Sequence, residues 1–311
     1  EWNRSSMNNS ASLPLVIGLG ELLWDCFGDD RRPGGAPANV AFQANQLGCR
    51  GTVVTRVGQD DLGRELLDFL KKQELSTDYV QVDENYPTGT VTVEFTDAND
   101  PQYTIHEQVA WDHLDFTAPL ATLMGDARAV CFGTLAQREA DSREAIHQCL
   151  AATSDDCLVV YDINLRQKYY DRDWIERSLK AARVVKLNQD EVEVLSELLG
   201  VSQDDLQKFA DQLQADYGVE AICITRGSQG CLIYAEGEVY DIPGTPVEVA
   251  DAVGAGDAFT AALISRRLLG WPWDRAALFA NRVGGLVASQ SGAMPVLRDE
   301  FEQLSQEIKN S

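Results

Sequence analysis

Basic side chains are scarce in this 311-residue chain, in which 26 Lys and Arg stand against 49 Asp and Glu for a formal net charge of −23. Binding to a nucleic-acid backbone or to an anionic membrane surface needs a basic footprint, so the composition excludes both as expected partners. Long hydrophobic runs are also missing, and none reaches the roughly 18 residues of a transmembrane helix. The 44% of hydrophobic residues is typical of a globular chain with a sizeable core.

Histidine is rare, with 3 residues, and the 7 cysteines are odd in number and scattered. Several of the cysteines lie in apolar, strand-like runs such as 221–225. This pattern excludes a disulfide framework, and no Cys or His pair has zinc-finger spacing. Buried, reduced thiols and a cytoplasmic protein are the expectation.

Three nucleotide-binding signatures are absent from the sequence. The pattern G-x-x-x-x-G-K-[S/T] of the Walker-type NTPases does not occur, and neither do the H-R-D and D-F-G motifs of protein kinases. Gly18 and Gly20 start a G-x-G-x-x-G pattern, but Leu23 and Trp24 stand where its third glycine should fall. A Rossmann dinucleotide site is therefore disfavoured.

What the sequence does contain is a regular alternation of short apolar runs and amphipathic stretches, which predicts an α/β fold with a mostly parallel central sheet and helices on both faces. The expected strands are 15–19, 51–57, 129–132, 158–162, 184–188, 221–225 and 231–234. The expected helices are 38–47, 62–73, 143–152, 174–182, 191–199, 204–217, 256–269 and 275–290. Because no polar linker divides the chain, we expect one domain over 13–311, with residues 1–6 as an artificial addition.

Residues 79–112 break this rhythm. Polar and apolar residues alternate over 90–95 and again over 103–105, with a turn at 97–101, which predicts an antiparallel hairpin. Together with the segment around 22–33 it should form a small antiparallel β lid over the carboxyl ends of the main strands, where α/β sheets bind ligands. A decorative excursion is the alternative. The apolar residues of this sheet (Val91, Val93, Phe95 and Ile105) could close over the chain's own active site or face a partner, the lid of a second copy; we expect the partner, and hence a homodimer through the lid.

The segment Asp251-Ala-Val-Gly-Ala-Gly-Asp-Ala-Phe259 follows a strand-like run at 247–249 and opens an Ala-rich helix. Gly254 and Gly256 permit a tight turn whose N–H groups point outward at a helix N-terminus, which makes an anion hole. Asp257 would then stand beside a phosphoryl group as a general base. The alternative is an ordinary Gly-rich turn with a helix-start acid.

Two further segments carry candidate binding residues. In Pro33-Gly-Gly-Ala-Pro-Ala-Asn-Val-Ala41 the glycines allow close backbone approach to a ligand, and Asn39 offers a donor and an acceptor to hydroxyls; read alone, it is a loop before a helix. Asn188 and Glu191, three residues apart at a strand end, fit a hydrated Mg²⁺. They fit a helix capping box equally well.

Together these motifs resemble the PfkB/ribokinase-like carbohydrate kinases, over nearly the whole chain from residue 15 to about residue 297. The motifs stand in family order: 34–39 (G-G-A-P-A-N), Asp162-x-Asn164-x-Arg166, Asn188-x-x-Glu191, 225–230 (T-R-G-S-Q-G) and 251–257 (D-A-V-G-A-G-D). The last motif usually has Thr where this chain has Ala252 and Val253. The resemblance implies a ribokinase-like three-layer fold with a β lid, and an ATP-dependent sugar kinase.

The resemblance also implies roles for single residues. Asp257 would be the catalytic base, and the N–H groups of Gly254, Ala255 and Gly256 would stabilise the transferring phosphoryl group. The sugar would be bound by Asp25, Gly35, Asn39 and Arg166 together with Asp257. ATP would be held by Asn188, Thr225, Gly227, Gly230 and Asn281. Glu191 and Asn188 would place Mg²⁺ through water, and Asp251 with the carbonyls of Val253, Ala288 and Ser291 would bind a monovalent cation such as K⁺.

The sugar itself is indicated by two segments. Gly20-Glu-Leu-Leu-Trp-Asp25 and residues 34–39 resemble the fructokinase branch, which implies phosphorylation of D-fructose to fructose 6-phosphate. The lid departs from that branch, because 105–107 and 110–112 replace its aromatic-Arg pair and Ala-Asp. Alternatives are a 2-keto-3-deoxygluconate kinase, a ribokinase-like kinase of another sugar, and a catalytically silent regulator that binds sugar or nucleotide.

Overall fold

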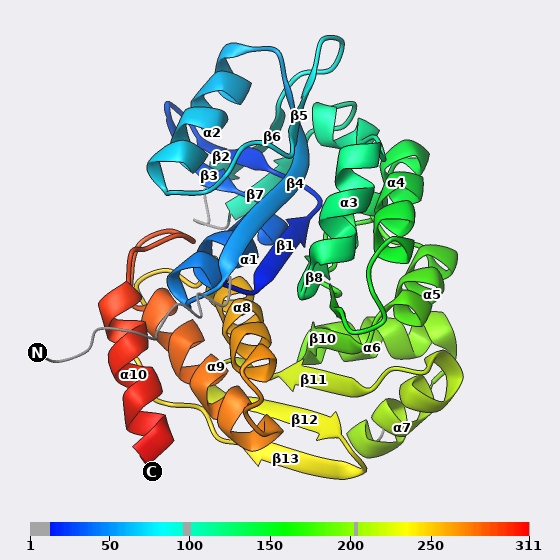
Figure 1. The fold of residues 1–311 in the computed structure, drawn as a ribbon, viewed down its shortest axis with the longest axis vertical. Coiled ribbons are helices and arrows are strands. Elements are labelled where there is room, and N and C mark those ends of the chain that lie inside the picture. The colour runs from blue at the N-terminus through cyan, green and yellow to red at the C-terminus, as the bar shows by residue number, and fades with distance from the viewer. Residues whose placement is uncertain (1–12, 96–100, 202–204, 311) are drawn as a thin grey trace, which may run out of the picture.

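The computed structural model describes residues 13–95, 101–201 and 205–310, which form a large and a small sheet (Figure 1). The strands of the large sheet are β1 (Leu15–Leu19), β4 (Arg50–Gly58), β5 (Val80–Asp83), β8 (Ala129–Phe132), β9 (Leu158–Asp162), β10 (Val184–Asn188), β11 (Ala221–Thr225), β12 (Cys231–Ala235) and β13 (Glu238–Ile242). Their order is β13-β12-β11-β10-β9-β8-β1-β4-β5. All pairs are parallel except β11–β12 and β12–β13, which confirms the expected mostly parallel sheet.

Helices cover both faces of this sheet (Figure 1). They are α1 (Ala36–Gln46), α2 (Asp61–Lys72), α3 (Ala118–Asp126), α4 (Ala140–Ala151), α5 (Arg172–Ala181), α6 (Gln189–Leu199), α7 (Leu206–Tyr217), α8 (Ala255–Leu268), α9 (Trp273–Ala288) and α10 (Arg298–Asn310), with short 3₁₀ turns η1 (Ala110–His113), η2 (Leu135–Gln137) and η3 (Gly227–Gln229). One hydrophobic cluster lies under α3 to α7, and another lies under α1, α8, α9 and α10. The result is a three-layer arrangement.

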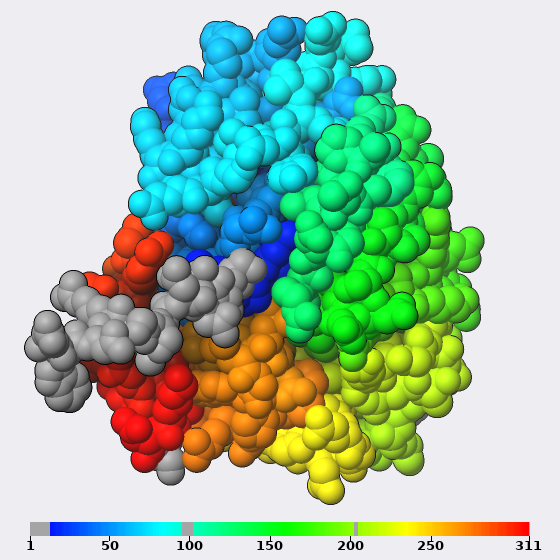
Figure 2. Space-filling model, viewed as in Figure 1, coloured from blue at the N-terminus to red at the C-terminus, as the bar shows by residue number. Residues whose placement is uncertain are grey.

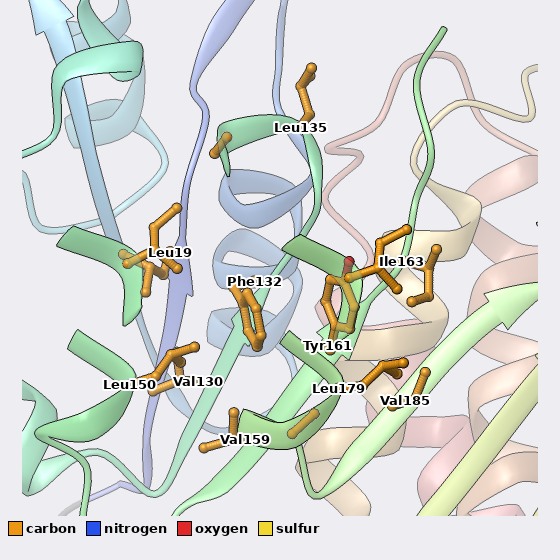
Figure 3. Packing of buried hydrophobic residues seen from close by; sticks show 14 of the residues in the cluster. Leu19, Val130, Phe132, Leu135, Leu150, Val159, Tyr161, Ile163, Leu179 and Val185 are labelled. Carbon is orange, nitrogen blue, oxygen red and sulfur yellow. The ribbon is translucent and has the colours of Figure 1, made fainter. Parts of the chain in front are cut away.

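The strand β1 shows how the apolar runs produce these layers. Leu15 and Ile17 enter the cluster under α3 to α7, whereas Val16 enters the cluster on the opposite face. Successive strand residues point to opposite faces, so a parallel strand covered on both sides must be apolar throughout. In the first cluster the rings of Phe132 and Tyr161 stack with centroids 4.9 Å apart (Figure 3).

The small sheet consists of β2 (Leu23–Phe27), β3 (Asp30–Gly34), β6 (Gly89–Phe95) and β7 (Pro101–Ile105), in the order β3-β2-β6-β7. It is antiparallel except that β2 and β6 pair in parallel. The expectation that the strands of residues 79–112 belong to the lid is wrong for β5, because β5 pairs with β4 and extends the large sheet. Val80 of β5 is buried with Leu66 and Leu70 of α2, and this packing holds the strand on the large sheet. The turn expected at 97–101 lies almost wholly outside the described residues.

The apolar face of the small sheet is turned inward. Val91, Val93 and Ile105 are only 6%, 4% and 7% exposed, and they pack with Leu23 and Trp111 of the same chain. The expectation that they face a partner is therefore wrong, and the side chain of Phe95 lies outside the described residues.

Figure 2 shows α2, β5 and β6 in blue and cyan at one end of the molecule, and the C-terminal helices in orange and red at the other.

Other elements also differ from expectation. Over the described ranges, residues 247–249 form no strand, and α3, α10 and β13 arise where no element was anticipated. All seven cysteines lie in described ranges as free thiols, six of them buried and Cys26 half-buried. Within the described part of the chain, a helix with the length and apolar character needed to cross a membrane does not occur.

Candidate active site

The carboxyl ends of the parallel strands bring the candidate residues to one edge of the large sheet. Asn188 and Thr225 end β10 and β11 and are direct partners in the parallel register. Asp162 ends β9, the other neighbour of β10. An edge of this kind is where open α/β sheets bind ligands.

The two Gly-rich segments meet at this edge although they are far apart in sequence. Asn39, in the first turns of α1, donates from Nδ2 to Oδ2 of Asp257 in the first turn of α8, at 2.7 Å. Gly35 caps α1 with φ 113°, and a Cβ there would lie 2.4 Å from the carbonyl oxygen of Glu21. Only glycine fits this position, so the chain can lead Asn39 directly to Asp257.

Asp257 has the electrostatic setting of a base that works near neutral pH. Burial, followed by the charge of Asp162, raises its pKa to about 6. The hydrogen bond from Asn39 and the charges of Lys186 and Arg166 act in the opposite direction. A pKa close to the working pH lets a carboxylate be ionised and still accept a proton readily.

The turn that precedes Asp257 exposes backbone donors. Gly254 is the N-cap of α8 with φ 78°, and within the described chain no side chain caps this helix end. The first N–H groups of an α-helix have no intrahelical partner, so they and the helix dipole are available to an anion. A Cβ on Gly254 would lie 2.6 Å from Ala293, so the turn is fixed by close packing as well.

Glu21 interacts with Asp257, and Asp25 shares with both of them an interaction with Arg166. Glu21 is 4% exposed; its Oε1 accepts from Ala36 N–H at 3.3 Å, and its Oε2 has no hydrogen-bond partner among the described residues. Burial raises the pKa of Glu21 to about 7 and that of Asp25 to about 6. Arg166 acts against both shifts, and it interacts with Asp257 too.

Sequence reasoning assigned no role to Glu21 or Lys186. Glu21 stands alone as an acid in the apolar run 13–24, and Lys186 is the one charge in the apolar strand β10. The ammonium of Lys186 contacts Oδ1 and Oδ2 of Asp162 at 3.0 and 3.1 Å. A lone charge in an apolar run of the sequence was the signal that could have identified both residues, because a buried charge needs a partner.

Asn188 and Glu191 form the capping box that was the alternative interpretation. Glu191 N–H donates to Asn188 Oδ1 at 2.8 Å, while the Glu191 carboxylate accepts from the N–H groups of Asn188 and Leu165 at 2.8 and 2.7 Å. These engaged oxygens fit Mg²⁺ only through water. No group of three or more His, Cys, Asp or Glu within the described ranges is arranged for a metal, so water and phosphate oxygens would have to supply the other ligands.

The remaining nucleotide candidates lie beyond β11. Asn281 of α9 donates to the carbonyl of Ile242 at 3.4 Å. A Cβ on Gly230 would lie 2.0 Å from that same carbonyl oxygen, so Gly230 and Asn281 meet at Ile242. Gly227, with φ 56°, starts the η3 turn that connects this point to Thr225 at the end of β11.

Two of the four expected cation ligands, Asp251 and Ala288, are engaged in other hydrogen bonds. Asp251 accepts from Val253 N–H at 3.0 Å and from Gly292 N–H, next to Ser291, at 3.1 Å. Its Oδ2 also lies 3.4 Å from Arg32 of β3. The carbonyl of Ala288 accepts from the N–H groups of residues 250 and 251 at 2.9 and 3.1 Å. In this arrangement the Ala288 oxygen has both lone pairs occupied.

Comparison with known proteins shows the family to which the chain belongs. The chain is 30% identical over 305 residues to a putative sugar kinase of Pyrococcus horikoshii, and the match covers 92% of this chain and 94% of the relative. The crystal structure of an uncharacterized sugar kinase from that organism superposes with a TM-score of 0.81, over 94% of this chain and 99% of the other. It is 29% identical to Escherichia coli fructokinase over 284 residues, or 87% and 91% of the two chains. A Xylella fastidiosa fructokinase with bound ATP, 21% identical, shares the fold with a TM-score of 0.83 over 95% and 99% of the chains. Residues 18–299 match the family model described as pfkB family carbohydrate kinase, and the chain belongs to this family.

Proposed function

We propose that this carbohydrate kinase transfers the γ-phosphoryl group of ATP to a hydroxymethyl group of a small sugar, with D-fructose as substrate and fructose 6-phosphate as product. The observation that carries the proposal is the 2.7 Å contact between Asn39 and Asp257. It joins a hydroxyl-binding loop to a base at a helix N-terminus, which are the two parts that phosphoryl transfer to a hydroxyl needs.

In the proposed reaction the carboxylate of Asp257 takes the proton of the sugar hydroxyl. The hydroxyl oxygen forms a bond to the γ-phosphorus as the bond to the ADP oxygen breaks. We assign the stabilisation of the transferring group to the backbone N–H groups of Gly254, Ala255 and Gly256 at the uncapped N-terminus of α8, where the Ala255 N–H would have to leave the Ala252 carbonyl, 3.3 Å away. Bound Mg²⁺ would neutralise phosphate charge, held through water by Asn188 and Glu191.

For ATP we propose a site formed by Asn188, Thr225, Gly227, Gly230 and Asn281. Support comes from their common position at the ends of β10, β11 and β13. A crystal structure of the Pyrococcus sugar kinase, 28% identical to this chain, was solved in complex with ATP. A fructokinase of Vibrio cholerae was solved with fructose, ADP and potassium. We propose K⁺ here as well, near Asp251, Val253 and Ser291, with Ala288 contributing only if one of its hydrogen bonds breaks.

The choice of a neutral sugar rests on charge. Glu21, Asp25 and Asp257 all interact with the single guanidinium of Arg166, and we assign these residues to the side of the site that receives the sugar. The unpartnered oxygen Oε2 of Glu21 and the buried, unpartnered Oδ1 of Asn39 in the described structure are acceptors, which suit sugar hydroxyl donors. A sugar acid would bring another negative charge to this set, so D-fructose is favoured over 2-keto-3-deoxygluconate.

An assay of ADP release across a panel of sugars, with and without K⁺, tests the proposal. We expect the highest kcat/KM with D-fructose, and a lower value for 2-keto-3-deoxygluconate. Preference for the sugar acid, ribose or a nucleoside would keep the family but overturn the assignment of fructose. If no ATP is consumed with any of these sugars, a catalytically silent binding protein is favoured.

Two further proposals concern the setting of the enzyme. Because the apolar face of the small sheet is buried within the chain, it no longer supports a homodimer. We propose a homodimer instead from β3 and β7, which are the edge strands of the small sheet. Such edges can pair with a second copy. Sedimentation of the purified chain tests this. A cytoplasmic location is proposed from the free, mostly buried thiols.

A further inference from the structure

A buried ionic cluster lies directly beneath the Gly254–Asp257 turn. Asp162 at the end of β9 accepts from the ammonium of Lys186 at 3.0 and 3.1 Å and from the hydroxyl of Thr260 at 3.0 Å. Thr260, in the second turn of α8, also lies 3.0 Å from the carbonyl of Gly256. A Cβ on Gly256 would lie 3.2 Å from the Lys186 ammonium, so this nitrogen is next to the turn.

Lys186 carries its charge although it is only 7% exposed. Burial lowers the pKa of Lys186, but the carboxylates of Asp162, Glu191 and Asp257 more than offset this, and the net result is a raised pKa. The two contacts with the Asp162 carboxylate at 3.0 and 3.1 Å likewise favour the ammonium form of Lys186. A buried ion pair is weak evidence for a stabilising role, since apolar residues of similar volume often replace one without loss. The position of the charge matters more.

We propose that Lys186 is a positioning residue for phosphoryl transfer: from below the Gly254–Asp257 turn its ammonium supplies a fixed positive charge to the place where the transferring group gathers negative charge. Asp162 and Thr260 hold it there. The inference rests on the proposed function, in which this turn binds the transferring phosphoryl group. In a chain with a net charge of −23, a fixed cation at this point favours the negative transition state where the overall field does not.

The ammonium and the base share their surroundings with groups from every element packed against them. These groups are Glu21 after β1, Cys131 of β8, Asp162 of β9, Arg166 after β9, Glu191 of α6 and Cys223 of β11. A variant of Lys186 therefore changes a balanced set of charges. The experiment has to separate two effects on turnover: the loss of the Lys186 charge, and the presence of a buried Asp162 carboxylate that has lost its ion-pair partner.

Three variants make that separation: Lys186→Met, Asp162→Asn, and the double variant. Lys186→Met leaves a buried carboxylate unpaired, so we expect both a lower unfolding midpoint and a kcat about 10²–10³-fold lower, as for loss of one transition-state donor. The double variant has no unpaired charge and should regain the unfolding midpoint. Its kcat should stay at least about 30-fold below wild type, while KM for the sugar changes less than about threefold.

A lysine that only neutralises Asp162 predicts a different result. In that case the double variant would recover kcat to within about threefold of wild type, which would overturn the inference. Lys186→Arg serves as the conservative variant, because it keeps the charge with a different shape, and it should retain more turnover than Lys186→Met.

A binding measurement gives a readout that does not depend on sugar turnover. ADP with Mg²⁺ and aluminium fluoride imitates the planar transferring group, whereas ADP with Mg²⁺ alone does not. Lys186→Met should weaken binding of the fluoroaluminate complex about 10²-fold and of ADP less than about threefold. Equal weakening of both would make Lys186 a nucleotide-binding residue and refute the inference. If the wild-type chain phosphorylates no sugar, but Lys186→Met still weakens binding of the fluoroaluminate complex more than binding of ADP, only the proposed function would be refuted.

Discussion

Asp257 is held between groups that raise its pKa and groups that lower it, and its amide partner Asn39 touches one of its two oxygens. Asp257→Asn keeps the shape and one acceptor but removes the base. We expect kcat to fall by several orders of magnitude, with the general-base contribution alone accounting for about 10²–10⁴-fold. Sugar binding, measured by calorimetry, should be largely retained.

Asp274→Asn is a matched control, because Asp274 is also a first-turn acid, in α9, and lies outside the site. It should leave kcat unchanged. Near-normal turnover of Asp257→Asn would remove Asp257 from the role of base.

The pH dependence follows from the raised pKa of Asp257. The base works when it is ionised, so kcat should fall as the pH falls through about 6. The hydrogen bond from Asn39 lowers this pKa, so Asn39→Ala should move the acid limb of the kcat profile to higher pH. Asn45→Ala, on the same helix but bonded to the carbonyl of Glu74, is the control and should not move it. A shift to lower pH in Asn39→Ala would contradict this reading of the contact.

At the residue level, the sequence indicated which side chains lie close together where a motif carries a backbone requirement. Asn39 and Asp257 were identified because each follows glycines that open a helix, and the structure brings the two together. Glu21 and Lys186 were missed because their importance arises from burial and from partners on other strands, which no local pattern records. The choice between a metal ligand and a helix cap at Glu191 could not be made from sequence, since both need the same spacing.

At the level of the helix, α8 is bounded by two glycines in the left-handed region. Gly254, at its N-cap, has φ 78° and would place a Cβ 2.6 Å from Ala293, whereas Gly270, just after its end, has φ 77° and no described atom within 4 Å of such a Cβ. Gly270→Ala should therefore cost only the backbone strain, about 1–2 kcal/mol of unfolding free energy. Gly254→Ala should cost about 1–3 kcal/mol more, from the steric conflict.

The same pair of variants separates strain from function. Gly254→Ala should reduce kcat strongly, because the first N–H groups of α8 move with the turn, and Gly270→Ala should not. Urea unfolding and steady-state kinetics measure both effects. Equal kcat in the two variants would show that the turn does not set the rate.

Element prediction worked for strands that are buried on both faces. The runs of β1, β8, β9, β10 and β11 are mostly apolar, and their bounds agree with expectation to within a residue. The four-residue strand β5 was assigned to the lid because a short polar-apolar alternation is the same in either sheet. The packing of Val80 against α2 places β5 in the large sheet, and this tertiary contact cannot be read from the local sequence.

For the molecule as a whole, the net charge of −23 acts on ATP and a neutral sugar differently. Raising the ionic strength from 0.01 to 0.15 M shortens the screening length from about 30 to about 8 Å. The long-range repulsion of MgATP should weaken, so KM for MgATP should fall a fewfold in choline chloride, a salt without K⁺. KM for fructose should stay constant and is the internal control. A salt effect on both would indicate a change in the protein itself.

The pairing of Asn39 with Asp257 spans 218 residues of sequence, and β1 lies inside the large sheet between β8 and β4. Contacts between distant parts of a chain form slowly, because the intervening loop must be closed before the contact is gained. During synthesis, the first Gly-rich loop must therefore wait for α8 to leave the ribosome before the site can assemble. Catalytic competence should appear only late in folding, after most of the sheet has formed.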